Sequence, residues 1–109
     1  ASVQLKPPAL GSNAWKNLMA VYQKTIGVPC INLSSDEMLK RFYLASNGLH
    51  GFIANVLEHS LESTDGNEQI CITHLSEAFD VSSCADLIEN PFKMSLPQVE
   101  RALALRANV

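Results

Sequence analysis

The chain lacks the features that mark disulfide-rich, metal-binding and membrane-spanning proteins. Its three cysteines, Cys30, Cys71 and Cys84, form no C-x-x-C pair, and an odd, scattered set is typical of reduced thiols in a cytoplasm. The three histidines are also far apart in the sequence, so they form no cluster of metal ligands. No apolar run approaches the roughly 18 residues of a membrane span, and residues 1–10 do not resemble a signal peptide. We expect a cytoplasmic protein that holds no metal and does not enter a membrane.

Motifs for catalysis are absent as well. The sequence contains no G-x-S-x-G, no H-E-x-x-H and no G-x-x-x-x-G-K-[ST] phosphate loop. The adjacent acids Asp36 and Glu37 suit the positive start of a helix better than they suit acid–base catalysis. We therefore predict that this chain alone has no catalytic residue, no enzymatic activity and no bound cofactor.

Charge is distributed unevenly between the two halves of the chain. Residues 1–57 carry five basic and two acidic residues, a net +3, whereas residues 58–109 carry three basic and nine acidic residues, a net −6. The second half therefore offers no basic tail for nucleic acid. The basic residues of the first half are more simply explained as a solvated surface than as a face that binds phosphate.

Apolar residues make up 47% of the 109 residues, which is enough for one domain with its own core. Their spacing predicts an all-α fold, a compact bundle of about five helices. The expected helices cover residues 13–25, 35–46, 49–61, 74–80 and 96–106. Residues 3–6 alternate apolar and polar side chains before two prolines, which predicts a short extended lead-in.

Polar residues mark the expected helix starts. Ser12 is the expected N-cap of the first helix, and Thr73 that of the fourth. Ser34 with Glu37, and Ser95 with Gln98, have the spacing of a capping box, in which each side chain bonds the backbone N–H of the other residue. These pairs predict the starts of the second and the last helix.

Two glycines stand at the junction of the second and third expected helices, in the stretch SNGLHGFI. Asn47 and Gly48 both tolerate the left-handed conformation that ends a helix. Gly51, in the first turn of the next helix, has no side chain and allows another group to come close. Either the tight packing of two helices or a nearby ligand explains this glycine, and the free N–H groups of a helix start favour a phosphate.

The order of these motifs resembles the helical lid of a AAA+ ATPase. The stretches that carry the resemblance are LASNGLHGFI at the corner, ICITHLSEAF in the fourth helix and NPF in the tail. The chain is similar to the TniB/TnsC family of transposition ATPases and, more distantly, to the phage Mu B protein. On this resemblance residues 1–11 are a lead-in from an ATPase core, residues 12–81 are the lid bundle, and residues 82–109 are a C-terminal extension with the last helix.

The resemblance implies a role in ATP-dependent DNA transposition. Members of the family bind ATP with Mg, self-associate on DNA, and recruit a transposase, a target-selector protein or both. The expected nucleotide-facing residues are Gly48, Leu49, Gly51 and Phe52. Many AAA+ lids place a phosphate-contacting arginine where this chain has Gly51, so no such side-chain contact is expected here. ATP and Mg are implied for the parent protein, whose core would hold them.

The tail has two explanations. Its apolar residues are candidate anchors for a transposase or target selector, in the manner of a helix that binds in a groove. These candidate partner-binding residues are Phe92, Met94, Leu96 and Val99. Alternatively, the last helix folds back on the domain.

Two other interpretations stay open. The chain also fits the lid of another AAA+ protein, such as an ExeA-type secretion ATPase or an origin-binding initiator, although no β-ribbon signal of a winged helix follows. It is also compatible with a stand-alone helical module that binds DNA or protein, since two helices joined at Asn47 and Gly48 resemble a helix-turn-helix. The helix that would read DNA has no Lys or Arg, which speaks against DNA contact.

Overall fold

Five helices follow one another in the part of the chain that the structure describes, as the apolar spacing predicts. The computed structural model describes residues 9–48, 50–64, 69–82 and 88–107. The helices are α1 (Asn13–Thr25), α2 (Asp36–Ser46), α3 (His50–Ser63), α4 (Ile72–Asp80) and α5 (Leu96–Ala107). The all-α prediction is confirmed. Most of the expected lead-in lies outside the described residues, and residues 9–12 enter α1 through a turn.

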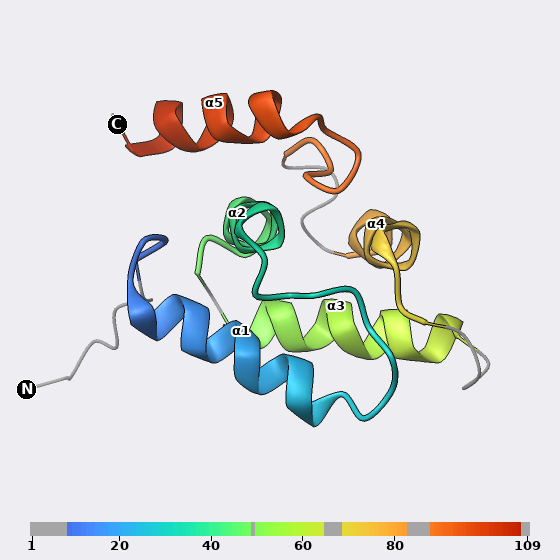
Figure 1. The fold of residues 1–109 in the computed structure, drawn as a ribbon. Coiled ribbons are helices and arrows are strands. Elements are labelled where there is room, and N and C mark those ends of the chain that lie inside the picture. The colour runs from blue at the N-terminus through green and yellow to red at the C-terminus, as the bar shows by residue number, and fades with distance from the viewer. Residues whose placement is uncertain (1–8, 49, 65–68, 83–87, 108–109) are drawn as a thin grey trace, which may run out of the picture.

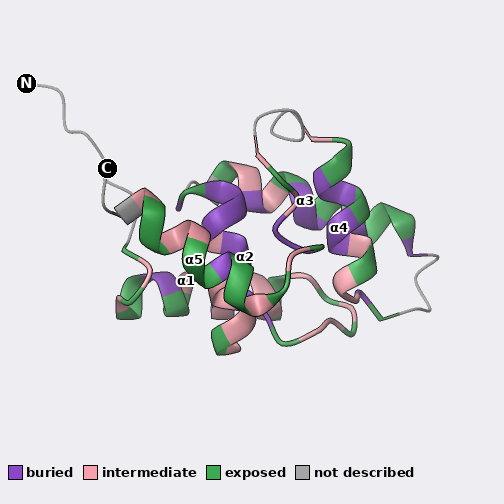
Figure 2. Cartoon of the chain, turned by 90° about the horizontal axis from the view of Figure 1, so that it is seen from above, coloured by how far each residue is buried: buried purple, intermediate pink, exposed green. Residues whose placement is uncertain are grey.

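The helices are stacked in three levels, with α2 at the centre. Figure 1 shows α5 at the top of the view, α2 and α4 end-on in the middle, and α1 and α3 at the bottom. Of the other helices, α1, α3 and α5 all contact α2, whereas α4 packs mainly on α3. Buried residues lie on the faces that the helices turn inward, and α5 carries mostly exposed and half-buried residues (Figure 2). None of the described helices is long and apolar enough to cross a membrane.

The core is built on the apolar stripes that the sequence predicts. Its largest fully buried side chains include Trp15, Met19, Met38, Phe42, Ile53 and Phe79. A chain of edge-to-face rings crosses the domain, because Phe92 contacts both Phe42 and Phe79 and Phe79 also contacts Phe52. On the other side, Trp15 meets Tyr43 edge-on and its Nε1 donates to the Leu39 carbonyl at 3.1 Å. That bond satisfies the buried indole N–H and fixes α1 against α2.

Two of the predicted caps are confirmed. The Ser12 hydroxyl accepts a hydrogen bond from the Trp15 N–H at the start of α1. At the start of α5, the Ser95 N–H donates to Gln98 Oε1 at 3.0 Å and the Gln98 N–H donates to Ser95 Oγ at 3.3 Å. This is the reciprocal capping box that the sequence predicts.

The predicted capping box of Ser34 and Glu37 is wrong, because the N-cap of the helix lies one residue later. The N-cap of α2 is Ser35, whose hydroxyl accepts from the Met38 N–H at 3.2 Å. The Ser34 N–H instead donates to the Asn32 side chain at 3.0 Å. That local bond forms a turn before the helix and delays its start.

Thr73 is not the N-cap of α4. Cys71 occupies that position, and Thr73 lies inside the helix. The reason is a short backbone pairing just before α4, in which Cys30 and Ile70 form a parallel bridge. The Ile31 N–H donates to the Ile70 carbonyl at 2.8 Å, and the Ile70 N–H donates to the Pro29 carbonyl at 2.9 Å. The extended segment ends at Ile70, so the helix begins directly after it.

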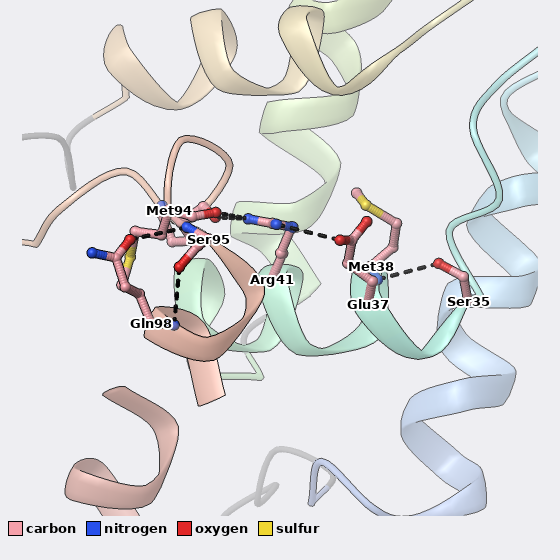
Figure 3. Close-up of polar contacts among 8 residues, drawn as sticks. Ser35, Glu37, Met38, Arg41, Met94, Ser95 and Gln98 are labelled. Atoms are coloured by element: carbon pink, nitrogen blue, oxygen red, sulfur yellow. Dashed lines mark hydrogen bonds and ion pairs between the residues drawn. The ribbon is translucent and has the colours of Figure 1, made fainter. Parts of the chain in front are cut away.

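A buried arginine joins α2 to the segment before α5 (Figure 3). Arg41 is only 5% exposed. Its Nη1 donates to the carbonyl oxygens of Pro91 and Met94, both at 2.6 Å, and its Nη2 pairs with Glu37 Oε1 at 3.4 Å. The sequence places Arg41 among the solvated charges, and that expectation is wrong. A signal was present, because Arg41 lies three residues after Met38 and four before Ala45, on the buried face of the helix.

Further polar contacts hold α5 along α2. Lys40 pairs with Glu100 of α5 at 2.9 Å and with Asp36 of its own helix at 3.2 Å. Near the other end, Arg106 Nη1 donates to the Leu44 carbonyl at 3.2 Å and to Asn47 Oδ1 at 3.4 Å. The last helix therefore folds back on the domain, which is the second of the two explanations for the tail.

We expect Arg41→Met to lower the free energy of unfolding by about 2–3 kcal/mol, because two inward-facing carbonyls lose their charged donor. Urea unfolding followed by circular dichroism measures the change. The matched control is Arg101→Met on the exposed side of α5, where the expected change is within about 0.5 kcal/mol. Equal effects of the two substitutions would contradict a special role for Arg41.

Candidate functional site

The corner between α2 and α3 has the left-handed geometry that its sequence predicts. Asn47 has φ 54° and Gly48 has φ 82°, and the Asn47 N–H donates to the Tyr43 carbonyl at 2.8 Å. The Ser46 hydroxyl stabilises the turn from inside. It donates to the Phe42 carbonyl at 2.7 Å and accepts from the Gly48 N–H at 3.1 Å. The chain thus leaves α2 through a turn in which the Asn47 and Gly48 N–H groups both have acceptors.

The space beside Gly51 is open. A methyl group built on Gly51 would meet no atom of the described residues within 4 Å outside its own helix turn and chain neighbours. Gly51 is exposed and lies in the first turn of α3, where backbone N–H groups have no partner within the helix. The described residues therefore show no tight helix packing against this glycine.

Phe52 connects this corner to the core. Its half-buried ring contacts Phe79 of α4, with ring centroids 6.1 Å apart. Next to it is an open hollow of about 280 Å³ between α3 and the end of α4, lined by residues that include Asn55, His59 and Ser82. Of the expected nucleotide-facing residues, Gly48 is buried in the turn and Gly51 is exposed. Leu49 lies outside the described residues.

The NPF stretch forms a second corner, between α4 and α5. Asn90 Nδ2 donates to the Ser76 carbonyl at 2.9 Å and to Asp80 Oδ1 at 3.0 Å, so it binds the end of α4. The side-chain oxygen of Asn90, Oδ1, accepts a hydrogen bond from the Phe92 N–H at 2.9 Å. Hydrogen bonds from Lys93 and Asn90 lower the pKa of the exposed Asp80. Together with the Pro91 carbonyl that receives Arg41, these contacts give the whole motif a structural role.

The candidate partner-binding residues fall into two groups. Phe92 and Val99 are buried in the fold of this chain, at 5% and 0% exposure, so neither is available to a partner in this conformation. Met94 and Leu96 are half-buried. Met94 also lines an open groove of about 280 Å³ between α2 and α5. Spacing alone did not separate the two groups, because burial of Phe92 and Val99 depends on contacts distant in the sequence.

One thiol–imidazole contact lies at the start of α4. Cys71 Sγ is 3.3 Å from His74 Nδ1, and the same nitrogen accepts the Cys71 N–H at 3.1 Å. The pair serves as the N-terminal cap of the helix. Burial raises the pKa of the Cys30 thiol to about 11, which keeps that thiol protonated at neutral pH. Within the described ranges, no three metal-ligating side chains come together.

We expect opposite effects from alanine at the two corner glycines. Gly48→Ala should lower the free energy of unfolding by about 1–2 kcal/mol, because a Cβ is strained at positive φ. Gly51→Ala should raise it by up to about 1 kcal/mol, because alanine is the better helix former and the space is open. Urea unfolding of both variants tests this. A loss of stability in Gly51→Ala would mean that the site is closed after all.

Comparison of the chain with protein-family models, with curated proteins and with solved structures found no match. A proposal about function can therefore rest only on features of the chain itself. Two such features are the corner between α2 and α3, with open space beside Gly51, and the tail that Arg41 fixes to α2.

Proposed function

We propose that this chain is the C-terminal lid and assembly region of a TniB/TnsC-type transposition ATPase. In this proposal the parent protein is cytoplasmic, binds ATP with Mg, self-associates on target DNA and recruits a transposase or target selector. The chain itself carries out no catalysis. Phosphoryl transfer needs a lysine and a metal held in fixed geometry around the phosphates, and the sequence of this chain contains no such phosphate loop.

The open space at Gly51 is the observation that supports the proposal most directly. In the described structure a side chain at Gly51 would meet no neighbouring atom within 4 Å, yet the first turn of α3 carries glycine, a poorer helix former than alanine. A nucleotide or a neighbouring backbone that approaches the start of α3 would account for it. The free N–H groups and the positive end of the helix favour a phosphate at that place.

In this role the lid contributes backbone and apolar surface rather than charge. Gly48 sets the turn, Gly51 leaves room beside the helix start, and Phe52 supplies an aromatic edge that is anchored on Phe79. Because Gly51 replaces the arginine found in many AAA+ lids, charge on the γ-phosphate would be met by the core of the parent protein.

The tail would act as a partner-recruiting segment that is held in a defined position. Arg41 and Asn90 fix residues 90–94 between α2 and α4, which leaves Met94 and Leu96 at the surface in part. A partner that binds here would meet a preorganised helix, which lowers the entropic cost of binding.

The test is ATP-dependent assembly of the full-length parent protein on DNA. Gly51→Arg should change assembly at least about tenfold, which corresponds to about 1.4 kcal/mol, because the side chain fills the space over the helix start and places a positive charge beside the phosphates. Phe52→Ala should weaken assembly, because it removes the aromatic edge. The matched control is Gly11→Arg, since Gly11 is also exposed and a side chain there meets nothing within 4 Å. If Gly51→Arg assembles as the wild type does, the corner does not face the nucleotide.

A further inference from the structure

An apolar groove lies between residues of α1 and α3. Both helices lie at the bottom of the view in Figure 1, away from α5. The groove has a volume of about 230 Å³, and its apolar lining consists of Tyr22, Ile26, Ala54, Leu57 and Leu61. Leu61, on the α3 side, is 37% exposed. The groove therefore leaves apolar surface in contact with water at a place that the proposed function does not use.

The α1 side of the groove carries a second exposed apolar residue. Val21 is 58% exposed and lies one helical turn before Thr25, which lines the groove. Val21 and Leu61 thus flank the groove from opposite sides. They are two of the four large hydrophobic residues that the described structure exposes most.

The charges beside the groove have opposite signs on its two sides. Lys24 is exposed at the end of α1, next to Thr25, whereas Glu58 and Glu62 are exposed on α3. None of these three residues takes part in the ion pairs found among the described residues. A nucleic acid or an acidic peptide over the groove would be repelled on the α3 side, and a basic partner would be repelled on the α1 side.

We propose that this groove is the interface of a twofold-symmetric dimer of the chain. Rotation by half a turn about an axis parallel to the groove brings Lys24 of one copy to Glu58 and Glu62 of the other. The same rotation lays Val21 of each copy against Leu61 of its partner. A patch that is apolar in the middle and oppositely charged at its two sides is complementary to itself, as an isologous interface requires. This inference does not depend on the proposed function, since it involves neither the α2–α3 corner nor the tail.

Sedimentation equilibrium of the chain, from micromolar to millimolar concentration at low salt, tests the proposal. The wild type should shift from monomer to dimer as its concentration rises, and added salt should weaken the dimer. Leu61→Arg should weaken dimerisation at least about tenfold, because it places a charge in the apolar centre. The matched control is Leu105→Arg, an exposed leucine on α5, which should dimerise as the wild type does.

A charge exchange separates this interface from any other mode of association. Lys24→Glu and Glu58→Lys should each weaken the dimer, and the double variant should recover part of the loss, because the pair between positions 24 and 58 re-forms with reversed sign while Glu62 faces a carboxylate. Thermal unfolding by circular dichroism checks that every variant is folded. A wild type that stays monomeric throughout, an equal effect of Leu105→Arg, or a double variant no better than the single ones would each overturn the proposal.

Discussion

The contact between Arg41 and the carbonyls of Pro91 and Met94 is the interaction on which the arrangement of the C-terminal region depends. A guanidinium group is strongly hydrated in water, so its burial is unfavourable unless acceptors surround it. Here two carbonyls and Glu37 take that place for Nη1 and Nη2, whereas the buried Nε has no acceptor among the described residues. The turn at residues 91–93 presents both carbonyls to the guanidinium. The buried charge and the turn therefore stabilise each other.

Asn90 and Phe92 hold this turn in place. Asn90 donates to the Ser76 carbonyl and to the Asp80 carboxylate of α4, and the Phe92 ring enters the core between Phe42 and Phe79. The polar and aromatic contacts of residues 90–92 thus hold α5 on the domain, where a large apolar interface is lacking. Val99 is the one fully buried side chain among the described residues of α5. The helix is held mainly at its start and by polar contacts along α2.

Local patterns predicted the helices well, because helix periodicity and capping depend on residues close together in the sequence. The stripe of α1, the Ser12 cap and the left-handed stop at Asn47 and Gly48 are all of this kind. The errors arose where distant segments decide. Cys71 caps α4 because Ile70 pairs with the loop before α2, and Arg41 is buried because residues fifty positions later supply its acceptors. Whether the space beside Gly51 is open also depends on segments distant in the sequence, so the sequence alone did not decide it.

The parallel bridge between Cys30 and Ile70 links the two halves of the bundle through their loops. Gln23 of α1 reinforces the same loop, since its side chain accepts from the Leu33 N–H and donates to the Cys30 carbonyl. The end of α1 and the start of α4 are therefore joined by backbone contacts that bypass the apolar core. A displacement of either helix end relative to the other would therefore have to break the two hydrogen bonds that join residues 29–31 to Ile70.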